Sequence, residues 1–466
     1  MPEPSGIYVG DRRLCSHCIS ERFLRRTVEN NGIKETCLYC EQQGNTISIK
    51  ELSDLVQEVL QDFYTWIESL STEENKIVRA TWGQPIGDVI NDLVGAGNAV
   101  AEDIRQVLEQ RQTDDRDQWD FEGAPFNPHA RYAKNRPPDA NELELSWRLY
   151  EHRLKTQTRY FNRSAEELLV SIFDGMENRQ TIDGRPIVIE AGPGKALLQV
   201  YRARVFQKEK EFRAALKRPH VEIGPPPPPL ASGGRMNAAG ISVFYAATTP
   251  ALALAEVRPP VGSKVLIGCF QVIRPLKLLD LIALTDLADE EGSLFDKLHI
   301  NHLRRAEFLR GLGERLSRPV MPNDQPLEYL PTQAVADFLA SDLLLSLDGI
   351  LYPSVQNAQF RRAQRRYRPF GGIDHNVVLF HKASQVAALD EGEQVDVSDG
   401  SFLFYDSETF EHDPNVSYYV GVSPPNDADT ADDVALRLIN LEARYIAGVQ
   451  FDAEPIQTLR VRRSVL

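Results

Sequence analysis

The stretch 234–258, GRMNAAGISVFYAATTPALALAEVR, places three chemically different side chains at similar intervals. Arg235 follows a glycine pair, Tyr245 lies in an apolar run typical of a strand, and Glu256 lies in an alanine- and leucine-rich run typical of a helix. Each residue alone has an ordinary explanation: a solvated loop charge, a core tyrosine and a surface glutamate. Their significance therefore depends on the segments around them.

Several flanking segments carry further polar residues next to strand-like runs. Upstream, VYRAR holds Arg202 and Arg204, which a strand places on one face because they are two positions apart. Downstream, EYLPTQAVADFLA is followed by DGILYPSV, which contains Ser354, and by HNVVLF, which contains Asn376. Short β-rich runs and intervening helices indicate an α+β arrangement rather than regular strand–helix alternation.

Together these motifs resemble the RES domain family, named for an arginine, a glutamate and a serine. GR-x-N, the FY-A strand, ALAEVR, YxPTQ, DGIxYPS and NVVLF occur in the family's order over about residues 186–385. The resemblance implies a fold similar to ADP-ribosyltransferases. It also implies an enzyme that degrades NAD by cleaving the nicotinamide–ribose bond, with phosphate or water as acceptor. Some family members are toxins, neutralised by a partner antitoxin.

The resemblance assigns roles that physical chemistry supports. Arg235, Tyr245, Glu256 and Ser354 are the expected catalytic residues, and Arg202, Arg204 and Asn376 the expected substrate-binding residues. Cleavage leaves an oxocarbenium-like ribose, which a carboxylate stabilises, while arginine suits a diphosphate and a tyrosine ring packs on nicotinamide. Ser354 would hydrogen-bond substrate or orient Glu256, since no histidine and aspartate companions indicate a triad.

Three other functions compete with NAD degradation. In the first alternative, the enzyme uses the same chemistry but transfers ADP-ribose to a protein or a nucleic acid. In the second, the chain is not an enzyme but a zinc-containing module that binds nucleic acid or a protein partner. The third alternative, a ribonuclease, is disfavoured because residues 45–177 contain no arginine followed by a histidine after four to six intervening residues; Arg148 and His152 are too close.

A phosphate-binding loop is excluded. The sequence EAGPGKA lacks the first glycine that such a loop requires.

Four of the five cysteines form two pairs near the N-terminus. Cys15-x2-Cys18 and Cys37-x2-Cys40 have the spacing of a four-thiolate zinc site, and four thiolates leave no open coordination position for catalysis. We therefore expect a structural zinc ion. Cys269 lies in the apolar run KVLIGCFQV and is expected in the core.

Hydrophobic periodicity predicts helices at about 52–64, 86–111 and 143–176. We expect four domains: a zinc-binding segment at 1–44, a helical domain at 45–180, a RES catalytic domain at 186–389 and an acidic C-terminal extension at 390–466. The first two look like the HEPN-related region that precedes some long RES proteins. The five prolines of GPPPPPLASGGR predict a surface loop.

Charge is concentrated in one region. The chain has 52 basic and 67 acidic residues, which gives a net charge of −15. The segment from Asp390 to Asp433 contains 13 acidic and no basic side chains, so the rest of the chain has a net charge of −2. An arginine-rich run, Arg361 to Arg368, would pair with that segment or attract phosphate groups. An inhibitor would be a separate protein, the helical domain or the acidic extension.

No apolar run is long enough for a transmembrane helix, and the first residues lack the apolar core of a signal peptide. We therefore expect a cytoplasmic protein. A homodimer is the default expectation for its assembly.

Overall fold

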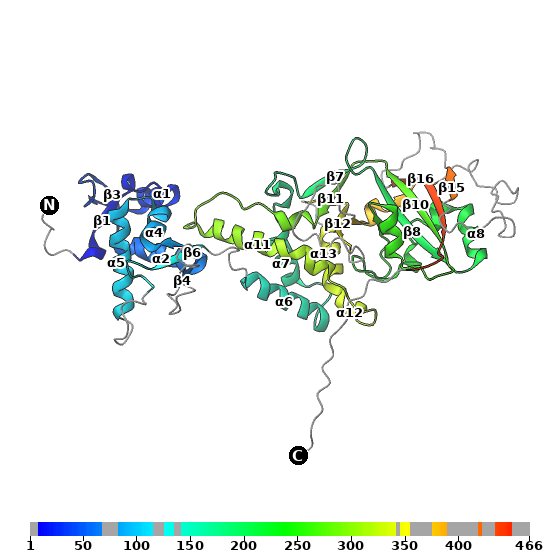
Figure 1. The fold of residues 1–466 in the computed structure, drawn as a ribbon, viewed down its shortest axis with the longest axis horizontal. Coiled ribbons are helices and arrows are strands. Elements are labelled where there is room, and N and C mark those ends of the chain that lie inside the picture. Colours follow the sequence, from blue (N-terminus) through cyan, green and yellow to red (C-terminus); the bar gives the residue numbers. More distant parts are fainter. Residues whose placement is uncertain are drawn as a thin grey trace, which may run out of the picture. The chain divides into compact units, whose positions relative to one another are not determined.

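A computed structural model describes residues 8–67, 83–114, 125–134, 141–341, 345–354, 375–388, 418–421 and 434–449. The chain forms two compact units, shown in Figure 1. Unit 1 comprises Met1–Glu144 and Asp289–Phe308, and unit 2 comprises Leu145–Ala288 and Leu309–Leu466.

Unit 1 combines helices with two small antiparallel sheets. Its helices are α1 (Arg22–Asn31), α2 (Ile49–Phe63), α4 (Ile86–Val94) and α5 (Asn98–Asp114), with 3-10 turns η1 (Val9–Asp11) and η2 (Ser16–Cys18). One sheet has the order β1-β3-β2, from Arg13–Cys15, Gln43–Ser48 and Ile33–Thr36. The other has the order β4-β6-β5, from Tyr64–Ile67, Arg131–Lys134 and Gln84–Pro85.

The helices of unit 1 begin and end where local chemistry dictates. Ser48 and Glu51 form a reciprocal capping box at the start of α2, and the periodic residues Leu52, Val56 and Leu60 are buried as the sequence predicts. The single helix predicted at 86–111 is interrupted. Gly95 adopts a left-handed conformation (φ 64°) that ends α4, a conformation that favours glycine.

Unit 2 surrounds one large mixed sheet with helices. The helices are α6 (Asn141–Thr156), α7 (Arg163–Phe173), α8 (Glu209–Lys217), α9 (Pro219–Glu222), α10 (Pro250–Glu256), α11 (Lys297–Ser317), α12 (Gln325–Glu328) and α13 (Leu330–Ser341). Two of them are divided between the units: the first four residues of α6 and the part of α11 up to Phe308 belong to unit 1. Short 3-10 turns are η4 (Met176–Asn178), η5 (Pro228–Leu230), η6 (Ala283–Asp286) and η7 (His381–Ala383).

The large sheet has the strand order β14-β16-β10-β8-β9-β13-β12-β11-β7, and β15 also pairs with β16. The strands are β7 (Val188–Ala191), β8 (Gln199–Phe206), β9 (Phe244–Ala247), β10 (Lys264–Val272), β11 (Leu276–Asp280), β12 (Gly349–Pro353), β13 (His375–Leu379), β14 (Gln385–Val386), β15 (Tyr418–Gly421) and β16 (Val434–Tyr445). Pairing is antiparallel except for β11 with β12 and β14 with β16. The α+β class predicted from the sequence is therefore correct.

Alternating residues of the strands supply two separate hydrophobic clusters. On β10, Val265 and Ile267 join Leu252 and Ala253 of α10, whereas Leu266 and Phe270 join a larger cluster that includes Phe212 of α8. This alternation follows from the two-residue period of a strand. The sheet is therefore covered on both faces, with α10 on one of them.

The sheet opens between β8 and β9. Within the described residues, Tyr201 with Ala247 is the one residue pair that joins these two strands, whereas β8 and β10 pair over eight positions. The two strands diverge on either side of that contact. Space is therefore available between them for other side chains or a ligand.

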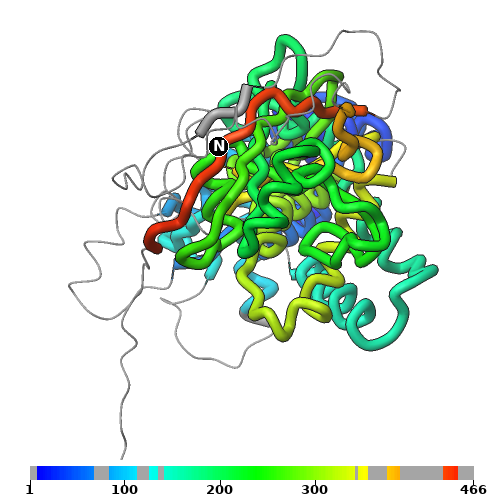
Figure 2. The backbone as a smooth tube through the Cα atoms, turned by 90° about the vertical axis from the view of Figure 1, so that its right-hand side faces the viewer, coloured from blue at the N-terminus to red at the C-terminus, as the bar shows by residue number. Residues whose placement is uncertain are grey.

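The domain boundaries expected at about 180 and 390 do not coincide with the compact units. Helices α6 and α7 belong to unit 2 because they pack on α13: the Tyr150 hydroxyl donates to the Pro331 carbonyl oxygen at 2.9 Å, and the rings of Phe173 and Phe338 lie 6.1 Å apart. β16, from the expected acidic extension, is an interior strand next to β10. Figure 2 shows β16, in red, running along the sheet.

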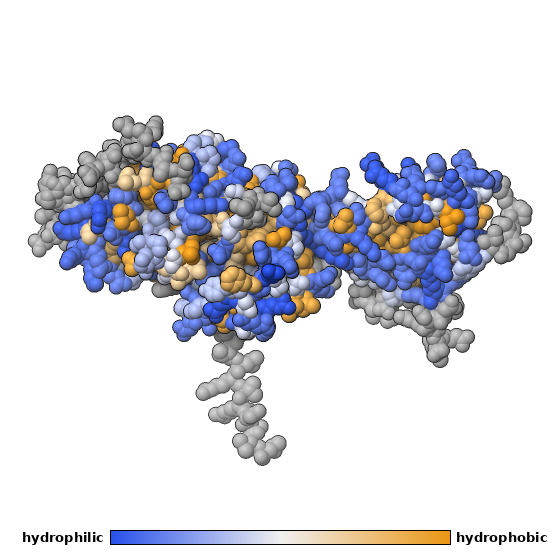
Figure 3. Space-filling view, turned by 180° about the vertical axis from the view of Figure 1, so that it is seen from behind, coloured by the Kyte–Doolittle hydropathy of each residue, from blue (hydrophilic) through white to orange (hydrophobic). Residues whose placement is uncertain are grey.

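Part of the expected extension and the arginine-rich run lie outside the described residues. Arg361 to Arg368 fall there, as do residues 389–417 and 422–433. Within the described part of the chain, no helix combines the length and the hydrophobicity that crossing a membrane requires. On the face shown in Figure 3, hydrophobic residues appear as separate patches among hydrophilic ones.

Removal of β16 tests its place in the sheet. The strand buries Leu436, Leu438 and Leu441, and each buried leucine contributes roughly 1.5–3 kcal/mol. Because whole domains are stable by only about 5–15 kcal/mol, a chain that ends at Asp433 should be insoluble or lose the cooperative unfolding of unit 2. A chain that ends at Val449 keeps β16 and provides the comparison. Circular dichroism melting compares the two, and an unchanged transition in the shorter chain would contradict the strand assignment.

Candidate functional site

A cavity of about 280 Å³ occupies the opening between β8 and β9. Small side chains create the space, and larger polar and aromatic groups stand around it. The lining residues are Tyr201, Arg202 and Ala203 of β8, Tyr245, Ala246 and Ala247 of β9, Ala253 and Glu256 of α10, the adjacent Val257, Tyr352 of β12 and Asn376 of β13.

Glu256 is the last residue of α10, and two donors hold its carboxylate. Helix α10 begins at Pro250 after a Thr249 cap, which orients the helix so that its end reaches the cavity. Glu256 Oε1 accepts from the Ser354 hydroxyl at 2.5 Å and from Asn376 Nδ2 at 2.8 Å. Both donors are nearly inaccessible to solvent, at 1% and 4% exposure. Among the described residues, no donor reaches the other oxygen, Oε2.

Tyr245 is held by the turn that precedes its strand. Its hydroxyl donates to Asn237 Oδ1 and accepts from the Met236 N–H, both at 2.8 Å. Asn237 Nδ2 in turn donates to the carbonyls of Ser232, Ala238 and Ile241. Burial raises the pKa of Tyr245 well above its ordinary value, and the Met236 N–H and the charge of Arg235 oppose that rise. The phenol is therefore a neutral, fixed group.

Arg235 does not line the cavity. Its Nη1 donates to the carbonyl of Leu316, in the last turn of α11, at 3.0 Å and to that of Arg318, just after the helix, at 2.9 Å, and its guanidinium lies 4.9 Å from the centroid of the Tyr329 ring. Its own carbonyl accepts from Thr332 of α13 at 2.5 Å. In this structure Arg235 fastens the turn 234–237 to α11 and α13.

The two arginines of β8 have different surroundings. Arg202 lines the cavity with its guanidinium 5.0 Å from the Phe244 ring centroid, and the described residues give it no carboxylate partner. Burial, with a smaller contribution from the charge of Arg204, lowers the pKa of Arg202 to about 10. Arg204 instead forms an ion pair with Glu222 of α9 at 2.9 Å and does not line the cavity.

The sequence analysis did not single out three residues that complete the site. Tyr352 lines the cavity, and its pKa is raised by burial first and then by Tyr245 and Glu256. Tyr201 lines the cavity from the opposite side, on strand β8. Gln333 Nε2 donates to the Gly234 carbonyl at 2.7 Å. Tyr352 and Gln333 lie inside the quoted motifs DGILYPSV and YLPTQ, which was the available signal.

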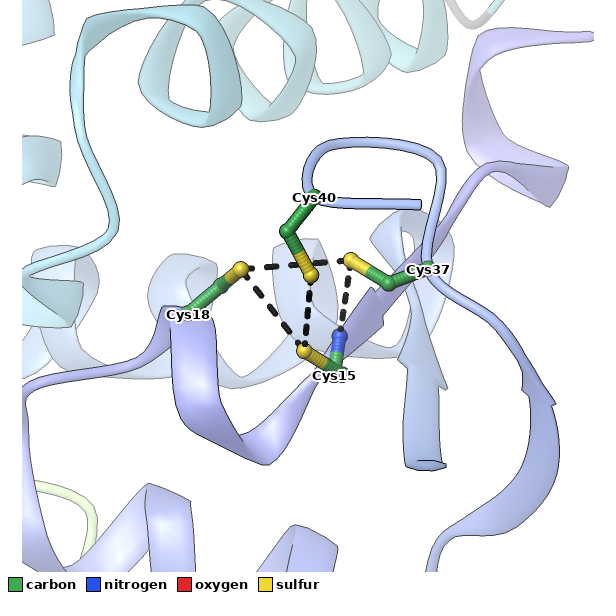
Figure 4. A group of neighbouring side chains, drawn as sticks. All are labelled: Cys15, Cys18, Cys37 and Cys40. Carbon is green, nitrogen blue, oxygen red and sulfur yellow. Dashed lines mark hydrogen bonds between the residues drawn. The ribbon is translucent and has the colours of Figure 1, made fainter. Parts of the chain in front are cut away.

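The four N-terminal cysteines converge in unit 1, as Figure 4 shows. The sulfur of Cys15 lies 3.6 Å from that of Cys18 and 3.5 Å from that of Cys40, and Cys18 and Cys37 are 3.9 Å apart. A tetrahedral ion with metal–sulfur bonds near 2.3 Å requires sulfur separations of about 3.8 Å. The four cysteines therefore form a group that fits a metal ion.

Backbone groups favour a thiolate at Cys37 and hold its loop, whereas burial raises the pKa values of Cys15 and Cys18. Burial of Cys37 acts to raise its pKa, but backbone N–H groups, among them that of Cys15 at 3.3 Å, outweigh this and lower the pKa to about 7. Tyr39 donates to Asp103 of α5 at 2.5 Å, and Asp103 also binds Arg12. These bonds connect the second cysteine pair to a buried helix.

Comparison with known families places all the lining residues of the cavity in one domain. Residues 199–402 match the RES domain family. The chain contains a RES domain. Every residue that lines the cavity falls within the matched range, and so does Ser354, which donates to Glu256. The four cysteines of the N-terminal cluster lie outside that range. No curated protein and no solved structure shows significant similarity to the chain.

The RES domain requires a glycine at position 234. A Cβ there would lie 2.7 Å from both the Asn237 Oδ1 and the Tyr245 hydroxyl, whereas a Cβ at Gly233 would meet nothing closer than 3.5 Å. Gly234→Ala should therefore destabilise the protein by roughly 1–3 kcal/mol, and Gly233→Ala should have little effect. Thermal unfolding of the two variants measures the difference, and equal melting temperatures would show that the turn is not closely packed on Tyr245.

Proposed function

We propose that the RES domain of this protein degrades NAD by cleaving the bond between nicotinamide and ribose, with phosphate or water as acceptor. The observation that carries the proposal is the anchored carboxylate of Glu256, which shares a small cavity with the guanidinium of Arg202, to which the described residues offer the Tyr245 carbonyl but no carboxylate. One group suits a developing positive charge and the other suits a diphosphate.

Glu256 has the arrangement needed to stabilise an oxocarbenium-like ribose. Ser354 and Asn376 occupy Oε1, so the carboxylate is oriented before substrate binds and Oε2 remains for a ribose hydroxyl or the cationic carbon. Preorganised charge accelerates a reaction because it needs no rearrangement as charge develops. Ser354 and Asn376 are therefore positioning residues in this proposal.

Arg202, Tyr245 and Tyr352 complete the binding groups. Arg202 is half-buried and has no carboxylate partner among the described residues, so it gains more from a phosphate than an arginine already in an ion pair does, and its planar donors fit phosphate oxygens. The two phenol rings offer flat surfaces for nicotinamide. Arg235 acts indirectly here, by holding the turn that fixes Tyr245.

The proposed reaction balances without a redox step. The bond between the ribose C1′ and the nicotinamide nitrogen breaks, and its electron pair neutralises the positive nitrogen of the leaving group. C1′ then forms a bond to an oxygen of phosphate or water. With water, the proton is released to solvent and free ADP-ribose results; with phosphate, the product is ADP-ribose 1-phosphate.

Nicotinamide release from NAD tests this function. Wild-type protein should release nicotinamide, and Glu256→Gln, which keeps shape but removes charge, should reduce the rate at least about 100-fold. Glu222→Gln is the matched control, because Glu222 pairs with Arg204 outside the cavity and should leave the rate unchanged. Full activity in Glu256→Gln would remove Glu256 from the mechanism.

The products separate the alternative activities. Free ADP-ribose indicates hydrolysis, and ADP-ribose 1-phosphate in phosphate buffer indicates phosphorolysis. Label from adenine-labelled NAD found on a protein or nucleic acid would instead indicate transfer to a macromolecule. Absence of turnover with properly folded protein would favour a non-enzymatic module.

We also propose that Cys15, Cys18, Cys37 and Cys40 hold a structural zinc ion. Four sulfur atoms at these separations suit the tetrahedral coordination of zinc. The ion would stabilise the N-terminal segment, in which strand β2 is exposed along its whole length.

Metal content tests the zinc proposal. Purified wild-type protein should contain one zinc per chain, and Cys15→Ser should lower this content and destabilise unit 1. Cys269→Ser, which changes a cysteine of β10, should retain the metal. Elemental analysis with thermal unfolding measures both effects, and an unchanged zinc content in Cys15→Ser would refute the assignment.

A further inference from the structure

The turn between α6 and α7 exposes two adjacent aromatic side chains. Tyr160 is 80% exposed and Phe161 is fully exposed. Phe161 also has φ of 55°, in the left-handed region that residues other than glycine rarely adopt. Exposure of a large apolar ring and an unfavourable backbone conformation both oppose stability, and such features concentrate at functional sites. Asn162 holds the turn by donating to the Thr158 carbonyl and by capping α7, but the described residues leave both rings largely uncovered.

Arginines flank these rings without acidic partners. Arg148, Arg159 and Arg163 are exposed, and no ion pair or hydrogen bond joins their side chains to another described residue. Elsewhere exposed arginines such as Arg204 and Arg213 bind carboxylates at 2.9 and 2.8 Å. Residues 148–163 contain five basic side chains and one acidic side chain, in a chain of net charge −15.

A second cavity, of about 330 Å³, lies in the same helical hairpin. Its polar lining consists of the side chains of Ser146, Arg153, Asn162, Ser164, Glu167 and Ser171, and Leu149, Tyr150, Ala165 and Leu168 complete the wall. Arg153 donates to Ser164 at 2.9 Å, and Ser164 donates to the Asn162 side chain at 2.9 Å, so the polar wall is ordered. The cavity adjoins the start of α7, directly after Phe161.

We infer that the α6–α7 hairpin, residues 145–173, binds single-stranded nucleic acid. The run Arg159-Tyr160-Phe161-Asn162-Arg163 places one cation on either side of two adjacent planar rings. Single-stranded nucleic acid has the matching pattern, since bases stack on aromatic rings while arginines contact the phosphates between them. The hydroxyl-lined cavity would accept a sugar or a base edge.

Other macromolecules match the hairpin less well. A membrane surface would require a continuous apolar face, whereas polar Arg159, Asn162 and Arg163 flank the two rings. An acidic protein would use the arginines but would not need two highly exposed rings side by side. Glu166 and Glu167 on α7 confine a polyanion to the turn and the α6 side.

Fluorescence anisotropy with a labelled 12-nucleotide single strand, as RNA and as DNA, tests the inference on the full-length protein. Tyr160→Ala and Phe161→Ala should each weaken binding about 5- to 100-fold. The double variant Arg159→Ala/Arg163→Ala should reduce the slope of log affinity against log salt by about 1.4, because each lost phosphate contact contributes about 0.7 for a single strand.

Two controls keep the result interpretable. Arg213→Ala removes an exposed arginine of α8 and should leave binding unchanged, and Tyr160→Phe keeps the ring and should bind like the wild type. Circular dichroism melting verifies that each variant is folded.

Several outcomes would overturn the inference. Wild-type affinity in the ring and arginine variants would assign any binding to another segment, such as Arg361 to Arg368. No binding at 50 mM salt, or tighter binding to polyglutamate or to anionic lipid vesicles than to the oligonucleotide, would also contradict it. Because the assay needs no NAD, failure here leaves the proposed NAD chemistry unaffected.

Discussion

One carboxylate oxygen connects the parts of the RES domain on which its proposed chemistry depends. Glu256 Oε1 accepts from Ser354, 98 positions later in the chain, and from Asn376, 120 positions later. These donors come from the ends of neighbouring strands β12 and β13, which are paired in register. A carboxylate that leaves water needs compensating donors, and here both donors are buried side chains. The position of α10 against the sheet is therefore coupled to the pairing of two distant strands.

The separation of β8 and β9 provides the second requirement, an open space in an otherwise closely paired sheet. Alanines at positions 203, 246, 247 and 253 line that space, where larger side chains would fill it. Arg202 stands half-buried in its wall, where the described residues offer its guanidinium the Tyr245 carbonyl but no carboxylate, so that an anionic ligand there would be favourable. The strands that flank the opening are supported on both sides, by β10 with β16 and by β13 with β12. The cavity is thus a property of the fold rather than of a single loop.

The sequence predicted much of this site because its residues lie in ordered motifs. Glu256, Tyr245, Arg202 and Asn376 were all singled out, and they line one cavity with Ser354 behind them. The position of Arg235 could not be predicted in the same way. Its spacing from Tyr245 says nothing about the direction of its side chain, which the carbonyls at the end of α11 determine. Arg204 likewise forms an ion pair with Glu222, and only the tertiary structure shows that these two residues are neighbours.

The fold shows the same division between local and long-range information. The cysteine pairs and α2 follow from short-range patterns and appear as expected. β16 was missed because its partner, β10, lies about 170 positions earlier, and because an acidic stretch precedes it. Tyr352 had no separate signal, since a tyrosine in a strand is usually a core residue. Its place beside Tyr245 and Glu256 depends on the pairing of β12 with β13 and of β13 with β9.

A crystal structure of the Glu256→Gln variant with NAD bound would test the central claim most directly, because it locates the substrate against the residues proposed to act on it. The account predicts the nicotinamide ribose between β8 and β9, with its C1′ next to residue 256 and the diphosphate on Arg202. NAD bound elsewhere in the RES domain, or with its adenosine half in this cavity and the nicotinamide ribose outside it, would contradict the account.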